Sequence, residues 1–449
     1  MSPTSLPAGP LGARAQTLLD LIEQVRTEGV ERFDFDAFDG MIGVKPEEPA
    51  PLEQRRRNWQ QLADRFGGGR VLSVDQPDAH ELRLEIESPD GSRWLLMVGV
   101  EADPPHRIEW FGHRQALGDR MVIRDAVAVD GPALDALERH EPVVAGDREV
   151  WVERSDYFDC CRLMAEPMYV VADDHGDIVG GMGGGKHPAR IGGVDYRMGY
   201  AHHLRIHRDH QRRGIWGHLA DAWYERYPLG DALDCSYGYV ARDNEVMQRA
   251  WRDMDNKWPV GPSRFLIDCA ATGTTADSSG SARVAAVDDI PVIVEILNEG
   301  HRDEEVWSPH AVDSFTTRVT RAPDLYEIGD VLIAEGDAAV VGVWAMGTKA
   351  VTVIRSPVGE RRQRRAIAVD HAFRPGHEDA YGAVLRGWCA RLAARGLTHL
   401  TVYSSPRSPG WHVLEDLAAE REDFDYWTPQ IAVPGDAADK GVYVDPIYF

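Results

Sequence analysis

The 449-residue chain is poor in cysteine, and its cysteines follow no metal-binding spacing. Their number is odd and two of them are adjacent, which argues against a framework of structural disulfides. Reduced thiols in a cytosol fit this pattern best. We therefore expect a cytoplasmic protein that holds no metal. The five cysteines are Cys160, Cys161, Cys235, Cys269 and Cys389.

Long hydrophobic runs and a basic charge balance are also missing. No stretch approaches the roughly 20 apolar residues that cross a bilayer. The segment from Met1 to Pro7 lacks the basic and apolar regions of a signal peptide. The net charge of -24 argues against general binding of nucleic acids or membrane surfaces, which requires a basic face. We expect neither as a partner, and the sequence leaves the oligomeric state open.

The composition is that of a folded protein, with 43% hydrophobic and 27% charged residues. The length allows about three domains of roughly 100–200 residues. In residues 14–118, helical patterns around 15–25 and 52–66 precede four short strand patterns, two of them joined by a Pro-Asp-Gly-Ser turn at 89–92. Helices followed by an antiparallel meander predict a small α+β cone. Its strand beginning at Pro104 resembles cystatin-like or nuclear-transport-factor-like domains, which implies no chemistry.

One sequence pattern occurs twice at identical spacing, which indicates the repeat of a whole domain. In each copy an Asp and a Pro stand where a helix cap and the first helical turn are expected. We predict domains at residues 119–270 and 283–449. The small polar residues between them, 271–282, have the composition of a flexible linker. The two copies read Arg124-x-Ala126-x-x-x-Asp130-x-Pro132-x-Leu134 and Arg283-x-Ala285-x-x-x-Asp289-x-Pro291-x-Ile293.

The strongest functional signal lies in residues 196–227. An extended segment, 196–207, leads into a glycine-containing turn at 211–217, and apolar residues at helical spacing follow. A strand–turn–helix of this kind directs the free N–H groups of the first helical turn at one point, where an anion binds. A pyrophosphate is the expected ligand. Four arginines are predicted to surround it: Arg205, Arg208, Arg212 and Arg213.

This turn resembles the signature of the GNAT N-acetyltransferase superfamily, Gln/Arg-x-x-Gly-x-Gly/Ala between a strand and a helix. Gln211 and Gly214 match the signature. Trp216 departs from it, because the family has Gly or Ala there, and Gly217 comes one place late. The alternative interpretation, a surface turn with solvated arginines, gains from this departure. The resemblance implies two mixed-sheet GNAT-like α/β domains in tandem, the first of them binding acyl-CoA.

In GNAT enzymes the strand before the turn separates from its neighbour, and the pantetheine arm of CoA fills the gap. The resemblance therefore implies that the backbones of Leu204, Arg205 and Ile206 bond the pantetheine amides. Asn244 matches the asparagine that contacts CoA in the family. The implied pyrophosphate contacts are the backbone amides of the turn: Gln211, Arg212, Arg213, Gly214, Trp216 and Gly217.

Transfer of an acyl group to an amine requires a base, because the amine is protonated at neutral pH. His202 and His203 lie near the expected thioester end, and an ordinary histidine pKa near 6.5 suits the task. Strand alternation predicts that they face opposite sides, so that at most one reaches the substrate. The alternative is that both are structural. Trp251 stands where the family places a proton-donating tyrosine, which leaves Tyr237, Tyr239, Ser236 or water as the acid.

The second copy has the elements of the fold without the signature. Its turn carries Glu378 and Asp379, which would repel a pyrophosphate, so we expect it not to bind CoA and to shape the acceptor site or the interface of the pair. The run at residues 361–365, Arg-Arg-Gln-Arg-Arg, has two open interpretations. It holds a phosphorylated acceptor, or it is a solvated strand edge.

The sequence thus favours an acyl-CoA-dependent N-acyltransferase, with acetyl-CoA as the expected donor and an amine of a small molecule or peptide as acceptor. Two alternatives remain open. One is aminoacyl transfer from charged tRNA, which the net charge disfavours. The other is a non-catalytic module that binds acyl-CoA, which Trp216 and Trp251 favour.

Overall fold

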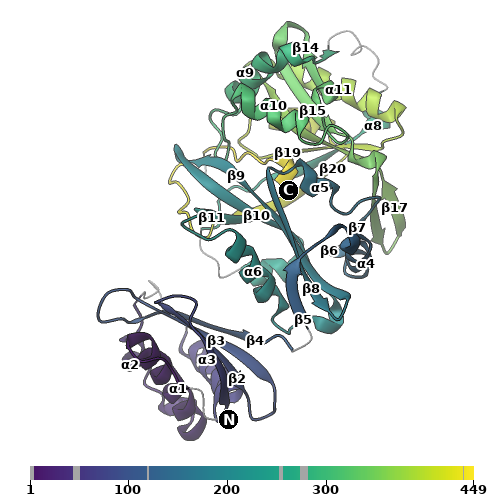
Figure 1. The fold of residues 1–449 in the computed structure, drawn as a ribbon. Coiled ribbons are helices and arrows are strands. Elements are labelled where there is room, and N and C mark those ends of the chain that lie inside the picture. The colour runs from purple at the N-terminus through teal and green to yellow at the C-terminus, as the bar shows by residue number, and fades with distance from the viewer. Residues whose placement is uncertain are drawn as a thin grey trace. The chain divides into compact units, whose positions relative to one another are not determined.

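The computed structural model describes residues 5–43, 51–118, 121–251, 256–273, 282–437 and 439–448. The chain forms two compact units. One comprises residues 1–122 with 210–217, and the other residues 123–209 with 218–449. Figure 1 shows the fold. No helix in the described ranges has both the length and the apolar character needed to cross a membrane.

The N-terminal unit packs helices on an antiparallel sheet. Strand β2 alternates buried and half-buried residues, so Leu82, Leu84 and Ile86 enter the core shared with α1. The predicted helices and the four-stranded meander are confirmed, while the likeness to cystatin-like domains stays a prediction. The elements are α1 (Pro10–Glu28), α2 (Phe35–Asp39), α3 (Leu52–Phe66), β1 (Arg70–Asp75), β2 (Glu81–Glu87), β3 (Arg93–Val100) and β4 (Ile108–Gln115).

A twelve-stranded mixed sheet organises the rest of the described chain. We call its strands before Gly273 the first half and those from Ala282 onward the second half. In spatial order they are β13 (Ala282–Val284), β14 (Val331–Ala334), β15 (Ala339–Trp344), β18 (Arg365–Phe373), β19 (His399–Ser404), β12 (Ser263–Asp268), β20 (Glu420–Trp427), β11 (Cys235–Ala241), β10 (Val194–Ile206), β9 (Asp177–Ile191), β8 (Glu166–Asp174) and β5 (Met121–Asp125).

The two halves exchange their last strands. Strand β12 of the first half pairs with β19 of the second, where Phe265 lies opposite Val402. Strand β20 of the second half pairs with β11 of the first, where Gly238 lies opposite Trp427. Both exchanged strands also pair with each other, so the sheet is continuous across the centre. The predicted division at residues 271–282 stays a prediction, and most of that linker lies outside the described residues.

The repeated sequence pattern builds the same corner twice. Arg124 donates to both carboxylate oxygens of Asp130, at 2.8 and 2.9 Å, and Arg283 does the same to Asp289, at 2.6 and 2.7 Å. Each carboxylate also accepts a backbone N–H three residues earlier, so it closes the turn before the helix and does not cap the helix itself. The Arg283 hydrogen bond lowers the pKa of Asp289 to about 2.

A smaller sheet joins the halves a second time, because β7 of the first half pairs with β16 of the second. Its strands are β6 (Val143–Ala145), β7 (Arg148–Arg154), β16 (Ala350–Ser356) and β17 (Gly359–Gln363). The helices of this unit are α4 (Gly131–His140), α5 (Asp159–Leu163), α6 (Ile215–Arg226), α7 (Glu245–Trp251), α8 (Cys269–Gly273), α9 (Ile290–Gly300), α10 (Val312–Thr320), α11 (Glu378–Ala394) and α12 (Trp411–Leu417).

A buried ionic network ties the end of the chain to the second half. Arg318 on α10 reaches Asp370 on β18 at 3.0 Å and Asp445 at 2.8 Å. The Tyr326 hydroxyl donates to Asp370 at 2.8 Å. Arg318 and Asp370 are almost fully buried, so one guanidinium compensates two carboxylates away from water.

We predict that Arg318→Met lowers the free energy of unfolding by about 3–5 kcal/mol, because it leaves two buried carboxylates without a cation. Urea denaturation measures the change. Arg302→Met is the matched control, since the Arg302 side chain is 63% exposed; it should shift stability by about 0.5 kcal/mol or less. Equal effects of the two substitutions would contradict this account of the network.

Candidate active site

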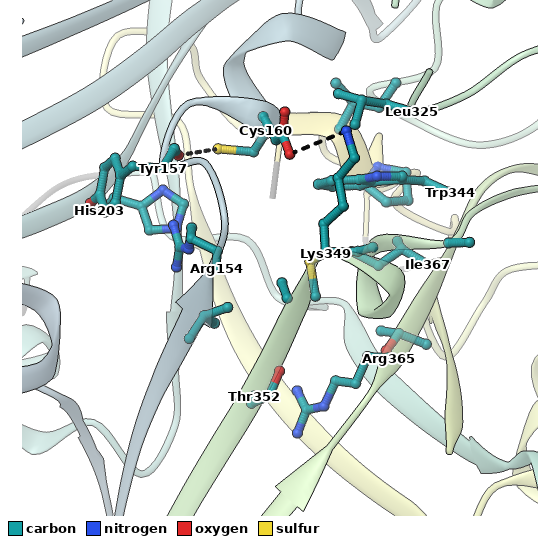
Figure 2. A pocket seen from close by; sticks show the side chains of 18 of the residues that line it. Arg154, Tyr157, Cys160, His203, Leu325, Trp344, Lys349, Thr352, Arg365 and Ile367 are labelled. Carbon is teal, nitrogen blue, oxygen red and sulfur yellow. Dashed lines mark hydrogen bonds and ion pairs between the residues drawn. The ribbon is translucent and has the colours of Figure 1, made fainter. Parts of the chain in front are cut away.

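A cavity of about 550 Å³ lies in the second unit, and both halves of the large sheet line it. This volume is within the usual range for small-molecule sites. The walls combine apolar side chains, among them Trp151, Trp344 and Ile367, with polar and charged ones. Figure 2 shows these walls, with His203 and Arg154 on one side and Lys349, Thr352 and Arg365 on another. Within the described ranges, no group of His, Cys, Asp and Glu side chains could hold a metal ion.

Strands β10 and β11 separate next to this cavity. Their parallel ladder has three pairs and ends at Tyr200 and Tyr237. Beyond it, β11 pairs with β20 and β10 pairs with β9 on their outer edges. In the described chain no ladder pair joins the facing edges of 201–206 and 238–241, so the two strands diverge beyond Tyr200 and Tyr237. Leu204, Arg205 and Ile206 lie on this edge; their contact with pantetheine stays a prediction.

A β-bulge places both histidines of β10 on the cavity. The register with β9 shifts between His202 and Arg205, and His203 has φ of +52°. The two rings are 4.7 Å apart, with Nδ1 to Nδ1 at 2.5 Å, and both line the cavity. The expectation that they face opposite sides is wrong, because a bulge interrupts the alternation of side chains on which it depends.

The histidine pair is uncharged at neutral pH. Burial lowers the pKa of both rings well below the ordinary value. The neighbouring His203 and then the charge of Arg154 lower the pKa of His202 further. The charges of Arg154 and then Arg205 lower that of His203 further. One Nδ1 must therefore donate to the other. Nε2 of His202 is buried and has no hydrogen-bond partner among the described residues. A neutral imidazole with a lone pair there can accept a proton.

The positive charge of Arg154 is fixed beside the pair. Its guanidinium donates to both oxygens of Glu138, at 2.8 and 2.9 Å, and lies 4.8 Å from the ring centroid of Tyr157. Both charged side chains are nearly fully buried. Sequence reasoning missed this ion pair, because nothing in the local pattern brings α4 and β7 together.

Glycines on β9 make room for the site. A Cβ atom at Gly183 would collide with the rings of His202 and Tyr169, and one at Gly184 would collide with Trp223. Only glycine lets these rings lie flat against the strand. The glycine run at residues 180–185 is therefore a signal that could have pointed to the site.

The predicted strand–turn–helix is confirmed, since β10 leads through the turn into α6. Within the turn, Arg212 and Gly214 have φ of +64° and +71°. The Trp216 side chain is 45% exposed, so the residue that departs from the signature points into solvent. The binding of pyrophosphate by the backbone amides of this turn, Gln211 to Gly217, stays a prediction.

Two of the four arginines predicted around the pyrophosphate are engaged elsewhere. Arg208 donates its Nε to Glu141 at 3.0 Å. The Arg205 side chain lines the cavity, and its Nη1 donates to the carbonyl of Leu204. The expected positive ring is thus wrong for these two residues, because Glu141 pairs with Arg208 and the Arg205 side chain turns into the cavity.

The candidate acids lie outside the cavity walls. The Tyr237 hydroxyl is 2.6 Å from Nε2 of His187, and the Ser236 hydroxyl is 2.9 Å from that of Tyr224. Neither residue nor Tyr239 lines the cavity in the described structure. Trp251 packs over Gly238 and against Trp427, which is a structural role. Asn244, directly before α7, accepts the N–H of Met247 at 3.2 Å; its contact with CoA stays a prediction.

The second half repeats the separation of strands without comparable space. Its β18–β19 ladder also has three pairs. The cavity beyond it measures about 20 Å³, room for about one water molecule, and side chains such as Phe373 and Tyr443 surround it. Arg374 after β18 is paired with Glu295 and Glu299. These observations agree with the expectation that this half does not bind CoA, which stays a prediction.

Comparisons with known proteins were made for the sequence and the structure. Residues 133–254 match the family model described as the Acetyltransferase (GNAT) family. No curated protein matches the sequence. The N-myristoyltransferase of Saccharomyces cerevisiae with bound myristoyl-CoA and inhibitors is similar over 75% of this chain and 84% of that chain, at 9% identity and a TM-score of 0.51.

Two further solved structures are similar. A second structure of the Saccharomyces cerevisiae N-myristoyltransferase, with bound myristoyl-CoA, gives 8% identity and a TM-score of 0.51 over 74% of this chain and 86% of that chain. A GCN5-related N-acetyltransferase from Sphaerobacter thermophilus gives 13% identity and a TM-score of 0.47, over 71% of this chain and 98% of that chain. At these identities the likeness shows the fold alone. The family match supports N-acyltransferase activity.

The depressed pKa values of His202 and His203 predict acid-sensitive stability. Below about pH 6.5 the unfolded chain takes up protons at these histidines and the folded protein does not, so the free energy of unfolding falls by up to about 1.4 kcal/mol per histidine per pH unit. Urea unfolding from pH 7.5 to 5.5 measures the slope. It should be shallower in the double variant His202→Gln/His203→Gln and unchanged in the exposed control His412→Gln. If the double variant keeps the wild-type pH dependence of the free energy of unfolding, the histidine pair is not buried in its neutral form.

Proposed function

We propose that the GNAT acetyltransferase domain at residues 133–254 works as an acyl-CoA-dependent N-acyltransferase, with acetyl-CoA as donor and an amine of a small molecule or peptide as acceptor. The observation that carries the proposal is the coincidence of two features. Strands β10 and β11 diverge beyond Tyr200 and Tyr237, and the histidine pair that follows on β10 lines the cavity. The acyl donor lies between the diverging strands, and the acceptor occupies the cavity.

The residues present fit a CoA thioester. An extended pantetheine arm would bond the backbone of β10 at Leu204, Arg205 and Ile206, beyond the end of the ladder with β11, as an additional strand would. The turn that follows has positive φ angles at Arg212 and Gly214 and leads into α6, whose N-terminal end would attract the pyrophosphate. CoA supplies the activated acyl group, and the protein supplies its alignment.

His202 accepts the proton from the amine. For Nε2 to carry the lone pair, Nδ1–H of His202 must donate to Nδ1 of His203, which makes His203 the group that fixes the tautomer. The amine nitrogen then bonds to the thioester carbon, the carbon–sulfur bond breaks, and the sulfur leaves with the electron pair. The charge of Arg154 disfavours the imidazolium, so His202 passes its proton to water, and water protonates the leaving sulfur.

A non-catalytic acyl-CoA-binding module is the second candidate. One observation favours it: Trp251 is packed over Gly238, and the tyrosine and serine candidates for the acid are hydrogen-bonded outside the cavity. Water would have to protonate the leaving sulfur in an active enzyme. Transfer from charged tRNA remains a third candidate, which the net charge of -24 disfavours.

We predict that Gly214→Glu abolishes CoA binding, because it places a carboxylate against the pyrophosphate and a side chain at φ of +71°. Calorimetry on the full chain measures the affinity. Gly193→Glu is the matched control: Gly193 also has a positive φ, +80°, but lies in the β9–β10 turn with open space around it. The control should bind one CoA per chain. Equal affinity of the two variants would remove the turn from the site.

We predict that His202→Ala lowers kcat about 10²–10⁴-fold through loss of the general base, with CoA affinity unchanged. His203→Ala should lower kcat less, because it removes only the group that orients His202. In the wild type the acid limb of the pH–rate profile should lie below pH 6.5, since the base keeps its lone pair to lower pH than an ordinary histidine. A thiol-release assay with a panel of amines measures these values.

The control for this experiment is the exposed His412→Ala, which should keep wild-type turnover. Normal turnover in both His202→Ala and His203→Ala would show that the base lies elsewhere. Glu153 and Asp234 would be poor substitutes, because Arg362 and Arg197 respectively hold their pKa values low. CoA binding without thiol release for any amine would favour the non-catalytic module.

A further inference from the structure

Arg365 is a buried cation on the cavity wall without a carboxylate partner of its own. It begins β18, is 6% exposed and lines the cavity. Its Nε donates to Oε1 of Gln363 at 2.8 Å, and its Nη2 donates to the same oxygen. In the described part of the chain, this neutral amide is the one side chain that has a hydrogen bond to the guanidinium.

The carboxylates near Arg365, those of Glu420 and Glu422, are paired with other arginines. Arg264, which also lines the cavity, is paired with Glu422, and Arg361 is paired with Glu420 at 2.7 Å. Burial, and then repulsion by Arg264, lowers the pKa of Arg365 to about 9, so the side chain is still a cation at pH 7. A buried cation is costly unless an anion accompanies it.

Further unpaired groups lie in the same walls. The hydroxyl of Thr401 is buried, has no hydrogen-bond partner among the described residues and belongs to a residue that lines the cavity. Nε of Arg264 is likewise buried and unpaired. In the view of Figure 2, Arg365 lies with Thr352 in a part of the cavity away from His203 and Arg154. Buried donors without partners are expected where a ligand supplies the acceptors.

We propose that the acceptor amine carries an anionic oxygen group, a carboxylate or a phosphate, which Arg365 binds with Arg264 beside it. This inference rests on the proposed function, which puts the acceptor in this cavity. The reacting nitrogen lies at the histidine pair and the anionic group at Arg365, so the two ends of the cavity fix the orientation of the acceptor. Of the arginine run at residues 361–365, only Arg365 lines the cavity within the described structure. Arg361 and Arg362 are half-exposed, so the interpretation of the run as a solvated strand edge applies to these two residues.

The test offers primary amines as matched triples that differ in one group. β-Alanine, β-alaninamide and O-phosphoethanolamine form one such triple. The thiol-release assay on the full chain should show kcat/KM about 10- to 100-fold higher for an anionic member than for the amide, which is the usual contribution of a charged hydrogen bond. The comparison of carboxylate with phosphate identifies the group.

Arg365→Gln should remove this preference through a higher KM with little change in kcat, because the guanidinium holds the acceptor away from the reacting atoms. Arg365→Lys should keep part of it. Arg361→Gln is the matched control, since it removes the same charge from a strand edge outside the cavity, and it should keep the wild-type preference. Calorimetry should give the same CoA affinity for all variants. An amide used as well as the anions, or a preference that survives in Arg365→Gln, would overturn the inference.

A binding measurement separates this inference from the proposed function. Succinate at constant ionic strength should raise the melting temperature of the wild type and of Arg361→Gln, but not that of Arg365→Gln. If no amine releases thiol while succinate still stabilises through Arg365, the anion site stands and the enzymatic proposal fails. If no amine reacts and succinate stabilises wild type and Arg365→Gln equally, the anion site is refuted as well.

Discussion

The exchange of the last strand between the two halves of the large sheet is the constraint on which the rest of that unit depends. Because β12 is held by β19 and β20 by β11, neither half completes its sheet alone. The pairing of β7 with β16 repeats the connection in the smaller sheet. The cavity walls therefore come from both halves, as a direct consequence of the interlocked fold.

Within this frame, one local irregularity positions the histidine pair. The bulge at His203 turns two successive side chains to the same cavity, where a regular strand would separate them. Their burial keeps both rings neutral, and the fixed charge of Arg154 maintains this state. The glycines opposite them on β9 leave the space that the rings occupy. The buried neutral histidine pair and its electrostatic surroundings thus follow from a few backbone features.

Local patterns in the sequence were sufficient for much of the fold. The alternation in β2, the glycine turn before α6 and the repeated Arg–Asp pattern each depend on neighbours a few residues apart, so they could be predicted. The strand exchange could not be predicted, because the sequences of β12 and β20 do not indicate with which strands they pair. The predicted orientation of His202 and His203 was wrong for a related reason, because the bulge depends on how β10 pairs with β9. Of the arginines at 361–365, the sequence could not tell which one turns inward.

The central claim is that one acyl-CoA binds between β10 and β11 of the first half, with its thioester at the histidine pair. A crystal structure of the full chain with CoA tests it most directly. The account predicts the pantetheine arm between β10 and β11, hydrogen-bonded to the backbone of residues 204–206, with the sulfur at the cavity beside His202. CoA bound between β18 and β19, or with its sulfur away from the histidines, would contradict the account.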